Sequence, residues 1–567
     1  MASSSSSSIM PLWRRALKRG GQATLVLGGG YCGFSAGLYA YDRDHFGSWL
    51  RLQKTAVLAS RMLSTYAWHL HFKQFATEED REEHFHQCHL RHAPELRDLC
   101  YSNGGLYIKV GQILGLMDHI LPYEYVESLA GCFDACPPSS NEDVETVFLE
   151  ELGKRPEEIF ESFEREPLAS ASFAQVHKAT LPSGQVVAVK VQHRPLQRTV
   201  QSEIEGVDFL LKIVRAIEPA FGFDWLAKEI REIMPKELDF RLEAENCERC
   251  RKIMERNGLK NAVVVPEIHP EFSTKRLLIM DFEEGQSLSA TAEDLNNAGI
   301  RPHAVVRRFA EAYAAMTFIE GFLHCDPHPG NVLWRRRKGA PEGFQLVLLD
   351  HGLYRELPDS LRLAYCRLWR SIAVADGDGV LEATRSIGVR SDWLRKQMLA
   401  EPQDGIGRDA GKCRTDEEVG DAETNAGKLF AAMLTARSFK AVSDGSGGLL
   451  RFDRDHRGKS REEDKKELSM YISGYYRGIL EVLDTLPRPM ILALKANDCL
   501  RATASRFEVP PSVPLAVSCL ACLKALRING DEGWRSWRLS WVIRAFLAVE
   551  CMVSSRFRHL RHTLVGA

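Results

Sequence analysis

The chain has 567 residues, enough for about three domains or one large enzyme with extensions, and its 44% hydrophobic and 26% charged residues exclude a wholly disordered protein. A formal net charge of −2 excludes nucleic-acid binding driven by an overall basic charge, so we expect no nucleic-acid partner. The 14 cysteines are spread along the chain, which excludes a small disulfide-stapled scaffold and favours reduced thiols.

The N-terminal segment is basic and then apolar. Residues 1–21 combine a run of serines with Arg and Lys and no acidic residue, which is typical of an organelle transit peptide; a charged, disordered tail is the alternative. Residues 22–41 carry no charge and are long enough to span a bilayer as a helix. Gly29, Gly33 and Gly37 are spaced for close helix contacts in lipid. The sequence therefore predicts a targeting segment followed by one membrane anchor.

The same segment contains a G-x-G-x-x-G pattern, formed by Gly28, Gly30 and Gly33, which is the dinucleotide-binding fingerprint. That fingerprint needs a second strand ending in an acidic residue about 20 residues later. Residues 50–71 have the pattern of a helix instead, so the motif alone gives weak support for flavin or NAD. A flavin enzyme stays an alternative, which the absorption spectrum of the purified protein would decide.

Hydrophobic periodicity predicts helices through Thr77–Leu152, because apolar residues recur there at spacings of three and four. Farther along, it predicts strands Val186–Gln192, Val263–Ile268, Leu277–Phe282 and Gln345–Leu349, and helices Ser202–Ile217, Ala227–Asn257 and His303–Glu320. Segments 399–428 and 443–468 are too polar to bury a core and are interpreted as mobile insertions. Few strands and many helices indicate an α+β fold with a small sheet lobe and a larger helical lobe.

Candidate catalytic residues lie in two polar turns. Asp326 and Asn331 belong to the segment His324–Asn331, and Asp350 follows the predicted strand Gln345–Leu349. Phosphoryl transfer needs an acidic group near the acceptor, and a second acid with an amide to hold Mg²⁺ between the phosphates. The spacing favours this chemistry; a proline-rich turn beside an unrelated Asp-His-Gly turn is the alternative.

Lys190 lies inside the apolar strand Val186–Gln192, where burial of a lysine is costly unless it meets an anion. In kinases, a strand lysine holds the ATP phosphates and pairs with a helix glutamate. An edge-strand lysine that extends to solvent is the alternative. Glu237, Asp239 and Glu243 follow, and their spacing predicts that Asp239 and Glu243 share one helix face; a solvated charged face is the alternative.

Lys109-Val-Gly111-Gln112 lies upstream, in the predicted helical extension. Together with the segments above, it resembles the hallmark Lys-x-Gly-Gln motif of the aarF-domain (UbiB) family of atypical kinases. The Ala-rich stretch 167–176 is similar to the loop that replaces the Gly-rich loop of other kinases, and Glu237-Leu-Asp239 is similar to the glutamate-x-aspartate motif. These motifs occur in the order expected of the family, from about residue 90 to about residue 390.

The resemblance implies a two-lobed, atypical protein-kinase-like fold with a helical N-terminal extension, a helical C-terminal region, and ATP with Mg²⁺ bound between the lobes. It implies that Lys109 pairs with the glutamate-x-aspartate acids over the cleft. The implied roles are catalytic for Asp326, Lys190 and Glu243, metal-binding for Asn331 and Asp350, nucleotide-binding for Ala169, Ser170, Ala171, Ser172, Lys190, Met280 and Phe282, and gating for Lys109, Gln112, Glu237 and Asp239.

Within the family, segments 433–438 and 486–498 resemble the N-terminally anchored mitochondrial branch, which is linked to lipid handling. This branch implies the mitochondrial inner membrane, and the basic residues before the span predict a kinase-like domain in the intermembrane space; another organelle membrane is the alternative. The implied function is an Mg–ATP-dependent atypical kinase or ATPase in membrane lipid or isoprenoid (ubiquinone-related) homeostasis. A catalytically weak pseudokinase scaffold for membrane lipid enzymes is the alternative. The expected partners are a membrane lipid or isoprenoid and membrane-bound lipid-metabolism proteins.

The predicted organisation is a targeting segment (1–21), a transmembrane helix (22–41), a helical extension (42–150), a kinase-like domain (151–395) and a helical C-terminal region with polar insertions (396–567). Two further patterns have structural alternatives. The cysteine pairs 247/250 and 519/522 have zinc-like spacing, but cysteines three apart on a helix simply share a face. The C-terminal aromatic and basic residues fit an interfacial helix or core packing equally: Trp534, Arg535, Trp537, Arg538, Trp541 and Arg544.

Overall fold

The computed structural model describes residues 43–115, 121–133, 138–217, 224–389, 416–435, 485–531 and 538–550, with a few isolated positions between these ranges. The predicted targeting segment 1–21 lies outside the described residues, as does the predicted span 22–41 apart from single positions. Within the described ranges, no helix combines the length and the apolar character needed to cross a bilayer.

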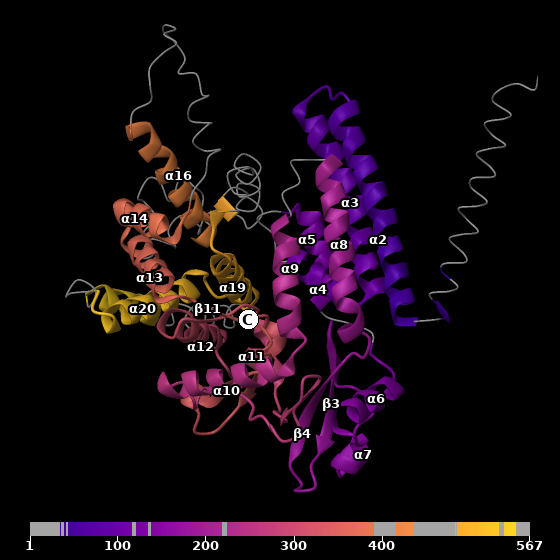
Figure 1. The fold of residues 1–567 in the computed structure, drawn as a ribbon. Helices are drawn as coiled ribbons and strands as arrows, with labels where there is room; N and C mark the ends of the chain where they lie inside the picture. The colour runs from indigo at the N-terminus through magenta and orange to yellow at the C-terminus, as the bar shows by residue number, and fades with distance from the viewer. Residues whose placement is uncertain are drawn as a thin grey trace, which may run out of the picture.

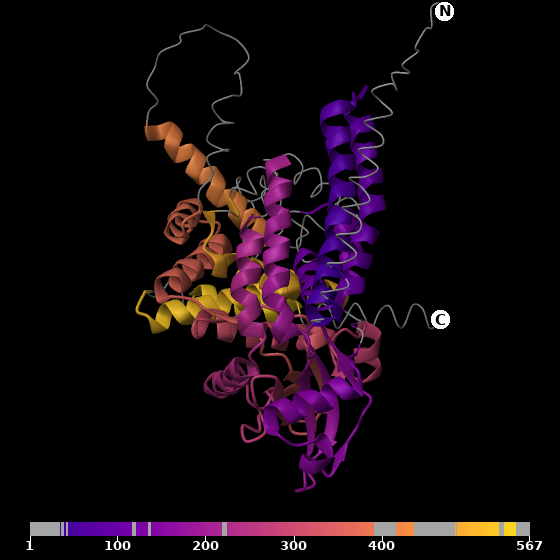
Figure 2. The same ribbon diagram turned by 45° about the vertical axis from the view of Figure 1, so that its right-hand side comes forward.

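The chain forms a sheet lobe, a larger helical lobe and a layer of long helices that stands above the sheet lobe (Figures 1 and 2). This arrangement confirms the predicted α+β fold. The sheet lobe contains β1 (Ser162–Phe163), β2 (Ala169–Ser170), β3 (Ala174–Thr180), β4 (Val186–Gln192) and β6 (Leu277–Asp281), with α6 (Asn141–Leu152) and α7 (Pro156–Ile159).

The five strands of the sheet lobe form one antiparallel sheet in the order β1-β3-β4-β6, with β2 beside β3. β4 matches the predicted strand. Its residues alternate between the two faces of the sheet: Val187 and Val189 are fully buried and pack in one cluster with Phe148 of α6. Lys190 therefore projects from the opposite face, toward the rest of the molecule.

The helical layer combines the N-terminal extension with two helices that follow β4 in the chain. α8 packs against both α2 and α4, so segments far apart in sequence lie side by side (Figure 1). The predicted helices through Thr77–Leu152 are confirmed. The layer comprises α2 (Arg43–Ala67), the π-helical turn η1 (Trp68–Phe72), α3 (Glu78–Asn103), α4 (Gly105–Gly115), α5 (Tyr123–Leu129), the 3₁₀ turn η2 (Ala130–Phe133), α8 (Leu196–Ile217) and α9 (Asp224–Glu237).

The predicted helix Ala227–Asn257 is wrong as a single element. α9 ends at Glu237, and α10 (Phe240–Arg256) begins after a break at Leu238 and Asp239. Asp239 has an extended backbone and caps α10, since its side chain accepts a hydrogen bond from the backbone nitrogen of Arg241. An aspartate competes well for this capping position, which ends the helical pattern there.

The helical lobe holds two small sheets, β5-β10-β9-β7 and β11-β8. The predicted strand Gln345–Leu349 is confirmed as β10, whereas Val263–Ile268 shortens to two residues. The elements are β5 (Val263–Val264), β7 (Gln286–Ser287), α11 (Ala292–Asn297), α12 (Pro302–Ala314), η3 (Ala315–Ile319), β8 (Phe322–His324), η4 (Pro329–Asn331), β9 (Val332–Arg336), η5 (Pro341–Gly343), β10 (Phe344–Leu348), β11 (Tyr354–Glu356), α13 (Asp359–Val374), α14 (Gly377–Ile387), α16 (Asp416–Thr435), α19 (Arg488–Arg506) and α20 (Ser512–Ile528). Residues 538–550 are also helical.

α16 corrects the interpretation of segment 399–428 as a mobile insertion. Residues 416–428 belong to this helix, and farther along it Leu429 and Phe430 are fully buried in the main core. The segment is mostly polar throughout, and the apolar run of the helix begins only after it, at Leu429, so the composition of the segment did not reveal the helix. The rest of that segment, the second insertion and the predicted domain boundary at 395/396 lie outside the described residues.

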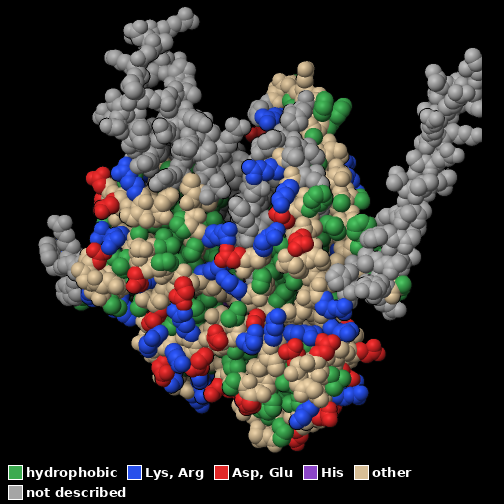
Figure 3. Space-filling view, viewed as in Figure 1, with side chains coloured by type: hydrophobic (Ala, Val, Ile, Leu, Met, Phe, Trp, Pro, Cys, Tyr) green, Lys and Arg blue, Asp and Glu red, His purple; other side chains and the backbone are tan. Residues whose placement is uncertain are grey.

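Charged side chains of both signs are interspersed over the face of the molecule seen in Figure 3, and green apolar patches lie between them. This distribution fits the net charge of −2. The buried apolar residues of the helical lobe form one large cluster, to which α12, α13, α19 and α20 all contribute. A rigid helical base therefore lies next to the strands that carry the candidate site.

Gly111 in α4 marks a close helix approach. A Cβ atom added there would lie 2.9 Å from Cys132 Sγ and 3.1 Å from Cys100 Sγ. We expect Gly111→Ala to lower the free energy of unfolding by about 1–3 kcal/mol, because both sulfur atoms lie inside a packed cluster. Chemical denaturation measures this change.

Two variants control for that experiment. Gly377→Ala adds the same methyl group where no atom lies within 4 Å, and it should leave stability nearly unchanged. Gly111→Ala combined with Cys132→Ala removes the nearer sulfur and should recover part of the loss. Because Cys132→Ala alone removes a buried side chain, the double variant is compared with both single variants, and losses of stability that simply add would contradict the steric explanation.

Candidate catalytic site

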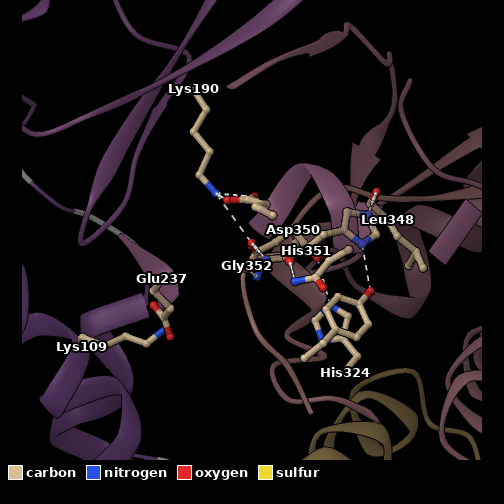
Figure 4. Close-up of polar contacts among 12 residues, drawn as sticks. Lys109, Lys190, Glu237, His324, Leu348, Asp350, His351 and Gly352 are labelled. Carbon is tan, nitrogen blue, oxygen red and sulfur yellow. Dashed lines mark hydrogen bonds and ion pairs between the residues drawn. The ribbon is translucent and has the colours of Figure 1, made fainter. Parts of the chain in front are cut away.

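Lys190 of β4 pairs with Glu243 of α10, and this pair joins the sheet lobe to α10. Figure 4 shows Lys190 pointing toward the turn that holds Asp350. Lys190 Nζ lies 2.7 Å from Glu243 Oε1 and 2.9 Å from Oε2. It also lies 3.7 Å from Asp350 Oδ1 and 5.2 Å from the ring centre of Phe240. Burial opposes the charge on Lys190, but Glu243 and Asp350 outweigh it and raise the pKa of the ammonium. The sequence predicts a strand lysine that pairs with a helix glutamate, and Glu243 is that glutamate.

The turn Asp350-His351-Gly352 is fixed from several sides. Asp350 Oδ2 accepts a hydrogen bond from Asn331 Nδ2 at 3.2 Å, and Asp350 Oδ1 accepts one from the backbone nitrogen of Gly352 at 3.1 Å. His351 donates from Nε2 to the carbonyl of Leu348, and α10 reaches the same turn through Asn246. Burial opposes ionisation of Asp350, yet Lys190 outweighs it and keeps the carboxyl pKa well below its usual range. Asp350 is therefore a rigidly held carboxylate.

His324 links the two polar turns that the sequence predicts as catalytic. Its Nδ1 accepts a hydrogen bond from the backbone nitrogen of Asp326 at 3.1 Å, so its Nε2 carries the proton that is donated to the carbonyl of Asp350 at 2.9 Å. Burial lowers the pKa of His324, which favours the neutral ring that this pair of bonds requires. The histidine thus sets the separation of the Asp326 and Asp350 segments.

Lys109 of α4 and Glu237 at the end of α9 form a second ion pair on the other side of the site (Figure 4). Lys109 Nζ lies 2.8 Å from Glu237 Oε2, and the two side chains are 12% and 8% exposed. Burial opposes the charge on Lys109, but Glu237 and then Asp326 outweigh it and raise its pKa. Gln112, on the same helix, donates from Nε2 to the carbonyl of Cys132 at 3.0 Å.

Asp326 has a partner that the sequence analysis missed. Lys495 of α19 lies 3.2 Å from Asp326 Oδ1, with side-chain exposures of 18% and 14%. Burial opposes ionisation of Asp326, but Lys495 and Lys109 outweigh it and lower the carboxyl pKa. One signal was available: Lys495 is the single charged residue in the apolar stretch 489–497.

One cavity of about 130 Å³ collects most of the candidate residues. It is smaller than the roughly 300–1,000 Å³ typical of ligand pockets. Phe173, Phe240, His328 and Leu353 also line it and were not among the predicted site residues. The predicted residues that line it are Lys109, Gln112, Ala171, Ser172, Lys190, Glu237, Glu243, Asp326, Asn331 and Asp350.

The remaining predicted residues do not line the cavity. Ala169 and Ser170 form β2, away from the hairpin tip at Ala171 and Ser172. Met280 is buried in a cluster with Phe240, and Phe282 lies just beyond the end of β6. They lie outside because the cavity occupies only the space beside Lys190, Asn331 and Asp350.

Asp239 corrects the predicted shared face with Glu243. Because it caps α10, its carboxylate turns to Arg241, at 2.9 Å and 2.6 Å, rather than to Lys109. Of the two motif acids, Glu237 alone pairs with Lys109. Among the described residues, the gating set of the sequence analysis therefore loses Asp239.

The cysteine pairs and the C-terminal aromatic residues lie elsewhere. Cys247 and Cys250 face the buried side of α10, where Cys247 Sγ donates to the carbonyl of Pro266. Cys519 and Cys522 are fully buried in α20. Trp541 is 63% exposed and so is not a core residue, while Trp534 and Trp537 lie outside the described residues.

Comparisons with known proteins place these residues in a family context. Residues 131–384 match the family model described as the ABC1 atypical kinase-like domain. A protein of Arabidopsis thaliana named as an ABC1 protein is 34% identical over 554 residues, with 94% of each chain covered. AarF domain-containing protein kinase 1 of Mus musculus is 35% identical, with 90% of this chain and 88% of the relative covered. The Gallus gallus protein of the same name is 37% identical, with 77% of this chain and 75% of the relative covered.

Two solved structures that match this chain are less identical to it than these relatives. A structure titled as an erythromycin complex of a Mycobacterium tuberculosis protein is 20% identical, with a TM-score of 0.43, and covers 76% of this chain and 97% of that one. The Rio2 kinase of Chaetomium thermophilum, titled as an ADP/Mg²⁺-phosphoaspartate complex, is 12% identical, with a TM-score of 0.22 and coverages of 68% and 97%.

Proposed function

Because the chain belongs to the ABC1 (AarF-domain) family of atypical kinases, we propose that it binds Mg–ATP between its lobes and transfers or hydrolyses the γ-phosphoryl group. The observation that carries this proposal is the convergence of Lys190, Glu243, Asp326, Asn331 and Asp350 on one cavity. These residues come from β4, α10 and the two turns around β9 and β10, and they supply the charges that phosphoryl transfer uses.

The residues beside Asp350 fit a magnesium ion. Asp350 and Asn331 offer hard oxygen donors, and the glycine at position 352 leaves space, since a Cβ there would lie 3.3 Å from Asp350 Oδ1. Lys109, Lys190 and Lys495 each lie closer to another carboxylate than to Asp350. The charge of Asp350 is therefore the least neutralised, and a bound cation would be stabilised most beside Asp350. Mg²⁺ held by Asp350 and Asn331 neutralises charge on the phosphates when bound.

In the proposed reaction, an acceptor hydroxyl oxygen bonds to the γ-phosphorus of ATP. The bond from that phosphorus to the β–γ bridging oxygen breaks, and ADP leaves with the electron pair. The hydroxyl proton passes to the Asp326 carboxylate, which the low pKa keeps ionised. Lys190 orients the phosphates, while Glu243 orients Lys190.

A specific observation favours a second candidate, a catalytically weak ATP-binding scaffold for membrane lipid enzymes. Asp326 is already ion-paired with Lys495, and the Lys109–Glu237 pair lies over a cavity of about 130 Å³. Both pairs would limit the access of an acceptor. The two candidates share nucleotide binding and differ in turnover.

Nucleotide binding is tested by Lys190→Met. We expect Mg–ATP to raise the Tm of the wild-type chain and to leave this variant unshifted, because the ammonium that meets the phosphates is lost. Lys178→Met is the matched control: it removes the same charge from the neighbouring strand β3, outside the cavity lining. A full Mg–ATP shift in Lys190→Met would count against the assignment.

Turnover is tested by Asp326→Asn. For an enzyme, we expect this variant to keep the Mg–ATP shift and to lose about 10²-fold or more of the ATP turnover, measured against a panel of lipids and isoprenoid head-group analogues. Equal turnover by wild type and variant would support the scaffold instead. Asp359→Asn, at the exposed start of α13, is the control.

We also propose that the chain acts at the mitochondrial inner membrane, on lipid or isoprenoid homeostasis, with the kinase-like domain in the intermembrane space. The basic, acid-free N terminus and the uncharged segment after it support this proposal. Protease added to mitochondria with a ruptured outer membrane should digest the domain and spare matrix markers. A domain that stays protected from the protease would contradict the proposed orientation in the intermembrane space. Release of the chain into the soluble fraction at alkaline pH would contradict the membrane anchor.

A further inference from the structure

α19 carries a lysine in an otherwise buried stretch. Leu492, Leu494 and Ala496 are buried, and the side chain of Lys495 is only 18% exposed. The helix packs against α12 and against β8, the strand that leads into Asp326. A lysine in such surroundings is costly unless it meets an anion. The position of Lys495 therefore depends on an anionic partner.

That partner is one oxygen of Asp326. Lys495 Nζ forms an ion pair with Oδ1 at 3.2 Å, and this buried atom has no hydrogen-bond partner among the described residues. Lys109 also acts on Asp326, but its own closest partner is Glu237. At the backbone, Asp326 is held by His324. Lys495 is thus the group that fixes the carboxylate itself.

We propose that Lys495 is a positioning residue of the phosphoryl-transfer site: it holds Asp326 through Oδ1 and leaves Oδ2 for the acceptor hydroxyl. This inference rests on the proposed function and adds to it a residue from outside the matched domain, residues 131–384. It makes α19 part of the active site. The C-terminal helices then do more than enlarge the core.

α19 is well held for this role. Its residues Asn497 and Arg501 donate to the carbonyl of Leu434 in α16, at 2.5 Å and 3.0 Å. Arg488 at its start is ion-paired with Glu232 of α9, the helix that ends at Glu237. The helix is therefore anchored on both sides of Lys495, which limits the movement of its ammonium relative to Asp326.

The test compares ATP turnover by the full chain and by Lys495→Met and Lys495→Arg. We expect Lys495→Met to lower kcat about 10-fold or more, because Asp326 is no longer held in place. The KM for ATP and the Mg–ATP shift in Tm should change less than about twofold, since Lys190 and Asp350 are untouched. Lys495→Arg keeps the charge and should regain most of kcat. Lys524→Met, on the exposed side of α20, is the matched control.

Several outcomes would overturn the inference. Higher turnover in Lys495→Met would make the ion pair inhibitory, and an equal loss in Lys495→Arg, or a parallel rise in KM, would point to packing alone. If Lys495→Met does not fold, Lys495→Gln gives the same comparison with a polar side chain. A wild-type chain that Mg–ATP does not stabilise would overturn the proposed function as well. Wild-type turnover with an unaffected Lys495→Met would overturn only this inference.

Discussion

Mutual repulsion among four carboxylates around one cavity is the constraint on which the arrangement of this chain depends. Glu237, Glu243, Asp326 and Asp350 lie together, and three lysines offset them from three separate parts of the sequence: Lys109 from α4, Lys190 from β4 and Lys495 from α19. Removal of one partner from a buried pair typically costs about 3–5 kcal/mol. The extension, the sheet lobe and the C-terminal helices must therefore assemble together for any one of them to be stable around the site.

The break between α9 and α10 is what allows one acidic segment to serve two lysines. In a continuous helix, Glu237 and Glu243 would lie about 120° apart around the axis and would therefore point to different faces. The chain instead turns at Leu238 and Asp239, and each glutamate meets its own lysine. The capping aspartate is thus a local feature with a distant effect, because it sets the direction in which α10 leaves the turn.

The sequence was most informative where a pattern is local. The alternation in β4 places Lys190, and the spacing of Asp326, Asn331 and Asp350 reflects two turns around a short sheet. Periodicity alone did not reveal the break at Asp239, because the same residues are compatible with one continuous helix and with a new helix that Asp239 caps. The contact of Lys495 with Asp326 joins positions 169 residues apart and depends on tertiary packing, so only the lone lysine in an apolar stretch pointed to it.

Under the proposed function, the same ion pairs would connect stability with nucleotide affinity. The cavity of about 130 Å³ is small for a ligand pocket, and the hairpin tip at Ala171 and Ser172 forms part of its wall together with Lys109 and Glu237. ATP would bring further negative charge to a site whose lysines are already paired, so its phosphates must compete with Glu237 and Glu243 for them. Separation of a buried pair is compensated only if the anion that enters takes the place of the carboxylate. A magnesium ion at Asp350 offsets part of that added charge, so metal and nucleotide are expected to enter the site as one complex.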